Sequence, residues 1–211
     1  MNKTQCIIKF VFDRLASLLG LLVLSPVFLI LMVLVKISVP KESPFFSQVR
    51  VGHRGKPFKM HKFRTMVDVP SGPQIAYPNR MHVTPLGSKL RKYKLDELPE
   101  LWDVLIGKMS LVGPRPDVPG YADRLEGEDR VVLEMRPGIT GPATLKYRNE
   151  EKMMEEYVHE AKSKGDPRSE MEIALWYNDC VIYPDKVRIN KEYYWHYSFF
   201  LDLKIIVQTV C

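Results

Sequence analysis

The sequence contains few cysteines and no metal-binding cysteine pattern. Only three occur among its 211 residues, Cys6, Cys180 and Cys211, and none belongs to a CxxC or Cys/His spacing. Their number and spacing exclude a disulfide framework and the common structural zinc sites. We therefore expect the protein to face a reducing, cytosolic compartment.

Charge is missing from one long segment near the N-terminus. No charged residue occurs from Leu15 to Val35, and Arg14 and Lys36 bound the run. A helix of this length is roughly 30 Å long, which is enough to cross the hydrocarbon core of a bilayer. The run has no small-residue cleavage pattern at its end, so we expect a retained membrane segment and not a signal peptide.

Ser25 and Pro26 lie almost at the middle of this segment. A proline inside a helix removes one backbone hydrogen bond, and a neighbouring serine hydroxyl can satisfy the freed carbonyl. Two half-helices would each reach roughly 16 Å, to the bilayer midplane and back. Basic residues flank both ends of the apolar segment, so no charge asymmetry favours moving one end across the membrane. We favour a re-entrant helix-break-helix with both ends on the cytoplasmic side; a kinked span is the alternative.

The rest of the chain has the composition of a folded domain with a basic surface. Hydrophobic residues make up 45% of the sequence, and the formal net charge is +6 at pH 7. This hydrophobic content suffices for one core and argues against disorder. The positive charge suits an anionic membrane face, a phosphorylated substrate or nucleic acid. We expect a membrane anchor over residues 1–40 and one cytoplasmic domain over residues 41–211.

The pattern after the anchor predicts an α+β domain that is mostly helical. Two alternating runs on either side of residues 52–55 predict a β-hairpin. The segment 68–80 is rich in Pro and Gly and predicts a loop. Thr84-Pro85 is typical of a helix start. A second helix is expected from Asp96 to near Gly107, with leucines and a tryptophan at helical spacing.

Three later segments complete this reading of the chain. The run SLVGPRPDVPGY (110–121) predicts a Pro-stiffened loop that carries Arg115. The charged segment 150–172 predicts solvated helix. The final segment, 193–211, begins with aromatic residues and continues as an apolar helix. It is either a core helix or a helix lying in the membrane interface.

Asp96 and Glu97 stand next to each other at the expected start of the second helix, where their charges repel. The helix dipole and nearby cations are expected to stabilise Asp96 as an anion and keep it available as a nucleophile. Glu97 would act as a base or share a Mg²⁺ ion with Asp96. The nearby cations are Lys89, Arg91, Lys92 and Lys94. Arg64 and Arg115 can each form bidentate hydrogen bonds to phosphate oxygens.

Five sequence blocks together resemble one family. They are the Ser25-Pro26 apolar segment, KFRTM (62–66), LDELPELWDVLIGKMSLVGPRP (95–116), RPGITGPA (136–143) and YPDKVRIN (183–190). An acidic pair at a helix start is weakly informative by itself, because acidic residues are common in first turns. The combination is far more specific. Over nearly its whole length the chain resembles the bacterial sugar transferases, the small monotopic phosphoglycosyl transferases.

This resemblance implies the transfer of a sugar 1-phosphate from a UDP-sugar to a membrane polyprenol phosphate such as undecaprenyl phosphate. UMP would be released and the assembly of a bacterial glycan initiated. The resemblance also implies that Asp96 forms a covalent phosphosugar-aspartyl intermediate and that Glu97 assists through Mg²⁺ or proton transfer. The substrate-binding residues that it implies or that we place around the site are Arg115, Lys62, Arg64 and Arg91.

The resemblance also bears on location. The Ser25-Pro26 break matches the re-entrant membrane helix of the family, which implies a monotopic protein at the cytoplasmic face of the bacterial inner membrane, in contact with membrane lipids. A homodimer at this interface is a reasonable expectation. Two residues depart from the family pattern: Lys94 stands where Ser or Thr commonly precedes LDELP, and Lys108 stands where Asp is common. Neither departure alters the acidic pair.

Two other functions stay open from the residues alone. A membrane-anchored, metal-dependent hydrolase of nucleotide sugars or lipid diphosphates would use the same acidic pair and need only water as acceptor. A non-catalytic module would bind anionic lipids through its basic helix. Nucleic-acid binding is not expected, because the sequence contains no recognisable nucleic-acid-binding module and its basic residues lie beside carboxylates.

Overall fold

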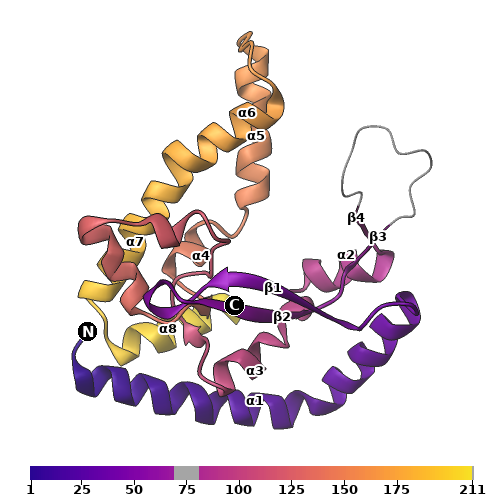
Figure 1. Cartoon of the computed structure of the whole chain (residues 1–211), viewed down its shortest axis with the longest axis vertical. Coiled ribbons are helices and arrows are strands. Elements are labelled where there is room, and N and C mark those ends of the chain that lie inside the picture. The colour runs from indigo at the N-terminus through magenta and orange to yellow at the C-terminus, as the bar shows by residue number, and fades with distance from the viewer. Residues whose placement is uncertain (69–80, 211) are drawn as a thin grey trace.

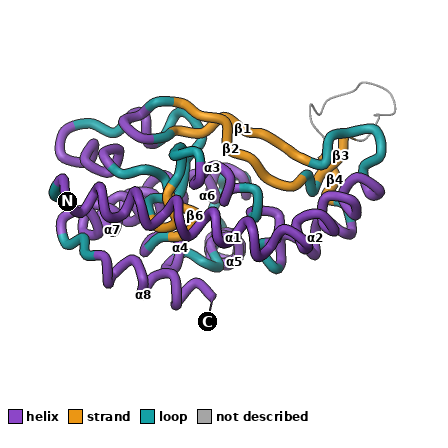
Figure 2. Tube along the Cα trace, turned by 90° about the horizontal axis from the view of Figure 1, so that it is seen from below, coloured by secondary structure: helices purple, strands orange, loops and turns teal. Residues whose placement is uncertain are grey.

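The structure is a computed structural model that describes residues 1–68 and 81–210. Its longest element is the helix α1 (Lys3–Ser38), which runs along the lower edge of Figure 1 with the other elements on one side of it. Figure 2, in which the molecule is seen from below, shows the same helix extending along it. The rest of the described residues are mostly helical, with three two-stranded sheets, as the sequence predicts. The predicted loop at 68–80 lies outside the described residues, apart from Asp68.

The bounds of the elements after α1 follow in chain order. The first half of the chain contains β1 (Phe45–Val51), η1 (His53–Gly55), β2 (Pro57–Phe63), β3 (Met66–Asp68), β4 (Met81–Val83), α2 (Pro85–Lys92), η2 (Leu95–Glu97), α3 (Glu100–Leu105) and β5 (Ser110–Val112). The second half contains η3 (Ala122–Arg124), η4 (Gly127–Glu134), β6 (Gly138–Thr140), α4 (Pro142–Lys146), α5 (Glu150–Ser163), α6 (Glu170–Tyr177), η5 (Asn178–Ile182), α7 (Tyr183–Trp195) and α8 (Phe199–Val210).

The predicted β-hairpin is confirmed. Strands β1 and β2 pair antiparallel, from Phe45 opposite Phe63 to Val51 opposite Pro57. The connection between them is the single turn η1, in which Gly55 has a φ of +75°. A side chain is strained at such a φ, so glycine is suited to close this turn.

Helix α1 contains Pro26 without an interruption of its helical assignment. In a straight helix the Leu22 carbonyl would accept a bond from the residue at position 26, and proline has no N–H to donate. The Ser25 hydroxyl instead donates to the Leu22 carbonyl at 2.8 Å. The second half of α1 turns upward (Figure 1), which a proline explains. The predicted helix-break-helix is thus one continuous, bent helix.

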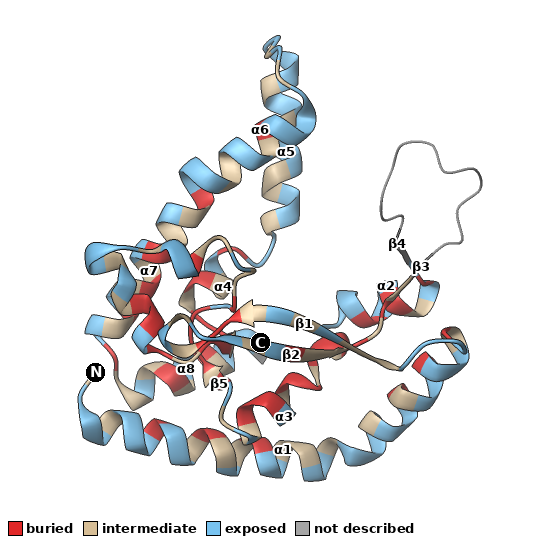
Figure 3. Ribbon diagram, in the orientation of Figure 1, coloured by how far each residue is buried: buried red, intermediate tan, exposed pale blue. Residues whose placement is uncertain are grey.

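The face that α1 turns toward the protein is partly polar, and the opposite face is apolar. Lys9, Asp13 and Ser17 are buried, whereas Leu19 and Leu22 are more than 60% exposed; Figure 3 shows the exposed outer side. Among the described residues, α1 is the helix long and apolar enough to cross a membrane, with a mean hydropathy of 3.0 over its most apolar window. Large exposed apolar surfaces of this kind mark contact with a partner or a membrane.

The N-terminal half of α1 is held to the rest of the protein by buried polar contacts. The Lys9 ammonium lies 2.5 Å from Asp202 of α8, and the hydroxyl of Tyr193 of α7 also donates to Asp202. One turn further along, Asp13 accepts a bond from the Ser110 hydroxyl at 2.6 Å. These contacts connect α1 to α7, α8 and β5.

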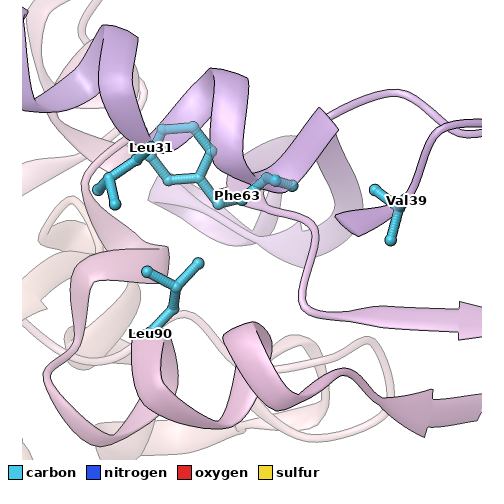
Figure 4. Packing of buried hydrophobic residues seen from close by; sticks show 5 residues of the cluster. Leu31, Val39, Phe63 and Leu90 are labelled. Carbon is cyan, nitrogen blue, oxygen red and sulfur yellow. The ribbon is translucent and has the colours of Figure 1, made fainter. Parts of the chain in front are cut away.

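The C-terminal half of α1 is held by hydrophobic packing. Leu31, Val35 and Val39 form one buried cluster with Phe63 of β2 and Leu90 of α2, and Figure 4 shows Phe63 and Leu90 beside the helix. Both ends of α1 therefore contact the same folded domain. The division of the chain at residues 40 and 41 stays a prediction.

The predicted helix start at Thr84 is confirmed, and the predicted start at Asp96 is wrong. The Thr84 hydroxyl caps α2 by accepting a bond from the Gly87 N–H at 2.9 Å. Asp96 lies in the 3₁₀ turn η2, and α3 begins only at Glu100. Pro99 cannot donate to the Leu95 carbonyl, which accepts from Leu98 at 3.3 Å instead. The proline thus separates the two elements.

The parallel strands β5 and β6 bring two distant loops together. Gly113 donates to the Thr140 carbonyl and Gly138 donates to the Pro114 carbonyl, each at 2.8 Å. A Cβ atom on Gly138 would lie 2.1 Å from the Gly113 nitrogen. Only glycines permit this approach, which holds the loop that follows β5. The start of the predicted loop at 110–121 is therefore a strand.

The charged segment 150–172 is confirmed as solvated helix. Helices α5 and α6 project away from the domain (Figure 1), and α5 has no buried residue. The buried Asp202 and Ile205 confirm the final helix, α8, as a core helix, whereas Phe200 is 81% exposed and contact with a membrane interface stays a prediction. One face of α8 belongs to the core, and the other is free to contact an apolar environment.

We expect Asp202→Asn to destabilise the fold by roughly 3–5 kcal/mol, because it leaves the buried Lys9 ammonium without its counter-ion. Urea unfolding of the detergent-solubilised protein measures this change. Glu160→Gln is the matched control, since it breaks the exposed Lys164 pair and is expected to leave the unfolding midpoint unchanged. Equal midpoints for Asp202→Asn and the wild type would contradict the role given to this ion pair.

Gly138→Ala is expected to destabilise the protein by roughly 2 kcal/mol or more, because backbone atoms occupy the place of its Cβ. Gly20→Ala is the control, since a Cβ there meets only Leu101 Cδ1 at an ordinary 3.6 Å. Thermal unfolding followed by circular dichroism compares the two variants. A Gly138→Ala protein as stable as Gly20→Ala would show that the β5–β6 loops do not need this close approach.

Candidate functional site

One large groove, with a volume of about 1610 Å³, gathers all the residues that the sequence analysis places at a site. Strand β2 and its C-terminal end contribute Lys62 and Arg64, and α2 contributes Arg91. The acidic pair Asp96 and Glu97 comes from η2, and Arg115 follows β5. Of the described residues, ten lysines and arginines but only five carboxylates line this groove. It suits an anionic ligand.

Glu97 is held as an anion by two cations. Its Oε1 atom accepts bonds from Lys62 Nζ and Arg115 Nη2, each at 2.7 Å. Burial alone would raise the pKa of Glu97, but Arg115 and Lys62 outweigh it and lower the pKa to about 2. Glu97 is therefore ionised at neutral pH and fixes the positions of both cations.

Asp96 differs from its neighbour. It is buried, and its Oδ1 atom has no hydrogen-bond partner in the described part of the protein. Burial and the charge of Glu97 raise the pKa of Asp96, while Lys62 and Lys94 oppose the rise. The expectation that a helix start stabilises the Asp96 anion is therefore wrong, because η2 is a single 3₁₀ turn and burial dominates. No protein group in the described ranges occupies this Oδ1 atom, so a substrate or metal ion could pair with it.

Lys94 sits directly before this pair with a φ of +56° and provides no side-chain cap. The left-handed conformation is uncommon for lysine. It turns the chain sharply between α2 and η2, so that Asp96 and Glu97 enter the protein interior.

Arg64 and Arg91 line the groove, but their hydrogen-bond partners are not the acidic pair. Arg64 Nε donates to the Ser43 carbonyl at 2.9 Å, and Arg91 Nε donates to Thr65 Oγ1 at 2.9 Å. The structure thus brings Lys62 and Arg115 onto the acidic pair and leaves Arg64 and Arg91 along the wall. Arg64 Nη2 also lies 3.6 Å from Glu42 Oε2.

The sequence analysis missed a third carboxylate beside the pair. Glu100 is buried, and its Oε1 lies 3.3 Å from Lys62 Nζ. Burial and the charge of Glu97 raise the pKa of Glu100 to about 7. Its position three residues after Glu97 was a signal, because residues at this spacing share a helix face.

Asp103 was missed as well, and it acts on the strand that carries Lys62. Its two oxygens accept bonds from the His61 backbone N–H and bond the His61 ring Nδ1, both at 2.8 Å. Asp103 is fully buried, so these bonds fix β2 against α3. Nothing in the sequence around Asp103 or His61 indicated that the two would meet.

Metal binding by the protein alone is not indicated in the described ranges. They contain no group of three or more His, Cys, Asp or Glu side chains placed to hold an ion. Two carboxylates suffice for Mg²⁺ when substrate phosphates and water complete its six ligands. The unpaired Oδ1 of Asp96 and its ionised neighbour Glu97 fit that type of shared site.

The arrangement has a clear chemical capacity. Cations along the groove can bind and neutralise phosphate groups, and Asp96 offers a carboxylate oxygen that no protein donor occupies. A carboxylate so placed can attack an electrophilic phosphorus. The site is therefore suited to phosphoryl-group chemistry.

Comparison with known proteins agrees with this chemistry. The uncharacterized sugar transferase EpsL of Bacillus subtilis (strain 168) is 35% identical over 205 residues, which cover 97% of this chain and 86% of EpsL. The exopolysaccharide production protein ExoY of Rhizobium meliloti (strain 1021) is 33% identical over 218 residues, covering 94% of this chain and 82% of ExoY.

A longer relative has a more specific name. The UDP-glucose:undecaprenyl-phosphate glucose-1-phosphate transferase of Klebsiella pneumoniae is 32% identical over 215 residues, and the match covers 100% of this chain but 41% of that protein. The model of the family described as "Bacterial sugar transferase" matches residues 4–211. The match extends over nearly the whole sequence and includes every residue of the groove, so the chain belongs to the bacterial sugar transferase family.

Proposed function

We propose that this enzyme transfers a sugar 1-phosphate from a UDP-sugar to undecaprenyl phosphate, with Asp96 as the nucleophile and UMP as the product released. The observation that carries the proposal is the buried, unpaired Oδ1 of Asp96 in a groove lined by cations. The names of the Klebsiella pneumoniae relative and of an Escherichia coli (strain K12) relative, 34% identical over 204 residues, support the same donor and acceptor.

The first step is a displacement at phosphorus. Asp96 Oδ1 attacks the phosphorus atom that bears the sugar, and the bond from this phosphorus to the bridging oxygen breaks. UMP leaves with that oxygen, and the phosphosugar remains on Asp96 as an acyl phosphate. Lys62 and Arg115 stand next to the reacting carboxylate and stabilise the charge that develops on the phosphate oxygens.

The second step repeats the displacement with the lipid. An oxygen of undecaprenyl phosphate attacks the same phosphorus atom, and the bond to Asp96 Oδ1 breaks. The lipid-linked diphosphate sugar forms, and the Asp96 carboxylate is regenerated. Two steps keep the two anionic substrates from having to meet directly, because each approaches the cationic groove in turn.

Glu97 and Mg²⁺ have supporting roles in this proposal. With a pKa of about 2, Glu97 is a poor proton acceptor at neutral pH. We assign it to holding Lys62 and Arg115 and, together with Asp96, to binding Mg²⁺. When bound, Mg²⁺ neutralises diphosphate charge. Of the two roles expected for Glu97, its low pKa disfavours proton transfer, and metal binding is the role that we propose.

The same proposal includes a monotopic location at the cytoplasmic face of the inner membrane. The outward apolar face of α1 supports contact with lipid. Both halves of α1 pack on one domain, Lys9 against Asp202 and Leu31 with Phe63. A helix that crossed the bilayer would place its two ends on opposite sides, so these contacts favour a helix that enters and leaves on one side.

Asp96→Asn is expected to lower the rate of sugar-phosphate transfer by about three orders of magnitude or more, because the amide is not a nucleophile. With donor alone, intact-mass measurement should show a phosphosugar adduct on the wild type and none on the variant. Asp166→Asn is the matched control, since Asp166 pairs with Arg168 in the exposed α5–α6 connection and should retain the adduct. An adduct on folded Asp96→Asn would disprove the nucleophile.

Turnover is expected to require the lipid acceptor. Without undecaprenyl phosphate, UMP release should stop near one equivalent per enzyme, and addition of the lipid should restore continuous release. Quantifying UMP over time in nanodiscs, with a panel of UDP-sugars and Mg²⁺, checks this. Continuous release without lipid would mean that water is the acceptor and that the protein is a hydrolase. No release from any donor would instead favour a lipid-binding module.

A further inference from the structure

Most of the buried polar atoms that lack a partner gather in one place. Six such side-chain atoms occur among the described residues, and five of them belong to residues that line the groove. Buried polar groups are normally hydrogen-bonded, so unpaired ones indicate a ligand or a functional site. The five atoms are Asp96 Oδ1, Arg50 Nε, Thr144 Oγ1, Tyr183 OH and Asn190 Oδ1.

Thr144 and Asn190 lie on two helices that contact each other. Thr144 belongs to α4 and Asn190 to α7. The end of α4 is bonded to the start of α7, because Lys146 Nζ and Tyr147 OH both donate to Asp185, at 2.6 and 2.8 Å. Asn190 lines the groove but is only 7% exposed, and its unpaired carbonyl oxygen is buried. These two side chains therefore offer neutral hydrogen-bonding groups to a ligand in the groove.

Arg50 and Asp117 connect the acidic pair to this part of the groove. Arg50 lies within electrostatic range of both Glu97 and Asp117, and Asp117 in turn lies near Lys186 and Tyr183 of α7. The acidic pair and the α4–α7 wall thus belong to one groove. The Tyr183 hydroxyl lies beside Asp117, which can pair with it.

Charges near the α4–α7 wall neutralise each other. The Lys186 ammonium lies 2.7 Å from Glu150, and Asp117 faces Lys186 and Arg50. By contrast, Lys62, Arg91, Lys94 and Arg115 line the groove around the acidic pair. Phosphates therefore prefer the acidic-pair region, and an uncharged polar group suits the α4–α7 wall.

We propose that Thr144 and Asn190 form a recognition subsite for an uncharged, hydrogen-bonding part of the nucleotide-sugar donor, either the sugar ring or the uracil base. Both carry N–H or O–H groups that an amide carbonyl and a hydroxyl can bind. The inference rests on the proposed function and deepens it. A site that hydrogen-bonds its substrate loses affinity when either partner is removed, because the other is left buried and unpaired.

The proposal separates stability from binding. Without a ligand, Asn190 keeps a buried carbonyl without a partner, which is unfavourable for the fold. A leucine of similar size would remove that cost. Asn190→Leu is therefore expected to raise the unfolding midpoint while weakening donor binding. A merely structural asparagine would change both in the same direction.

The test compares three variants of the full-length protein in nanodiscs. Asn190→Leu and Thr144→Val are each expected to raise the KM for the UDP-sugar roughly three- to tenfold, with the KM for undecaprenyl phosphate unchanged. Thr140→Val is the matched control: Thr140 also lines the groove, but its hydroxyl bonds Thr209 Oγ1 at 2.7 Å. This control should lower the unfolding midpoint and leave both KM values unchanged.

Inhibition by UMP distinguishes the two parts of the donor. If the variants raise the KM for the UDP-sugar but bind UMP as the wild type does, the subsite recognises the sugar; if UMP binding weakens equally, it recognises the base. Wild-type KM values for the donor in both folded variants, or a change confined to the lipid acceptor, would overturn the subsite. Absence of turnover in the wild type would instead overturn the proposed function, so the two failures are distinguishable.

Discussion

The site depends on one electrostatic constraint: two adjacent carboxylates are buried together, and only one of them is neutralised by the protein. Lys62 and Arg115 both donate to the same oxygen of Glu97. Their charges offset the burial of Glu97 but leave Asp96 with an unpaired oxygen and a raised pKa. Burying an unpaired polar group costs free energy. A substrate or metal ion that pairs with Asp96 would remove this cost.

The supports of this pair come from distant parts of the chain. Lys62 extends from β2, whose backbone is fixed by Asp103 of α3. Arg115 follows Gly113, which approaches Gly138 so closely that neither position has room for a Cβ. The left-handed Lys94 and the 3₁₀ turn before Pro99 direct the carboxylates inward. Each of these contacts positions a residue of the site only when the whole domain is folded.

Helix α1 connects this site to a large exposed apolar surface. Its inner face holds buried polar contacts to α8 and β5, while its outer face is apolar. A helix in water would have the reverse pattern. The contact of its second half with Phe63 places the apolar helix next to β2, the strand whose end carries Lys62. The exposed apolar face of α1 and the cation-lined groove are thus parts of one packed unit.

Local signals in the sequence indicated most of the elements and the acidic pair. The alternation around residues 52–55, the Thr84-Pro85 cap, the apolar run with Ser25-Pro26 and the acidic pair are all short-range patterns, and their outcomes follow from nearest-neighbour chemistry. The predicted helix start at Asp96 was wrong for a local reason, because Pro99 shifts the start of the helix to Glu100. Asp96 is therefore a buried acid in a 3₁₀ turn and not an anion at a helix start. Tertiary structure alone decided which cations reach Glu97, that Arg64 and Arg91 bond elsewhere, and that Thr144 and Asn190 join the groove. Those contacts link residues far apart in the chain, and no local pattern encodes the packing that brings them together.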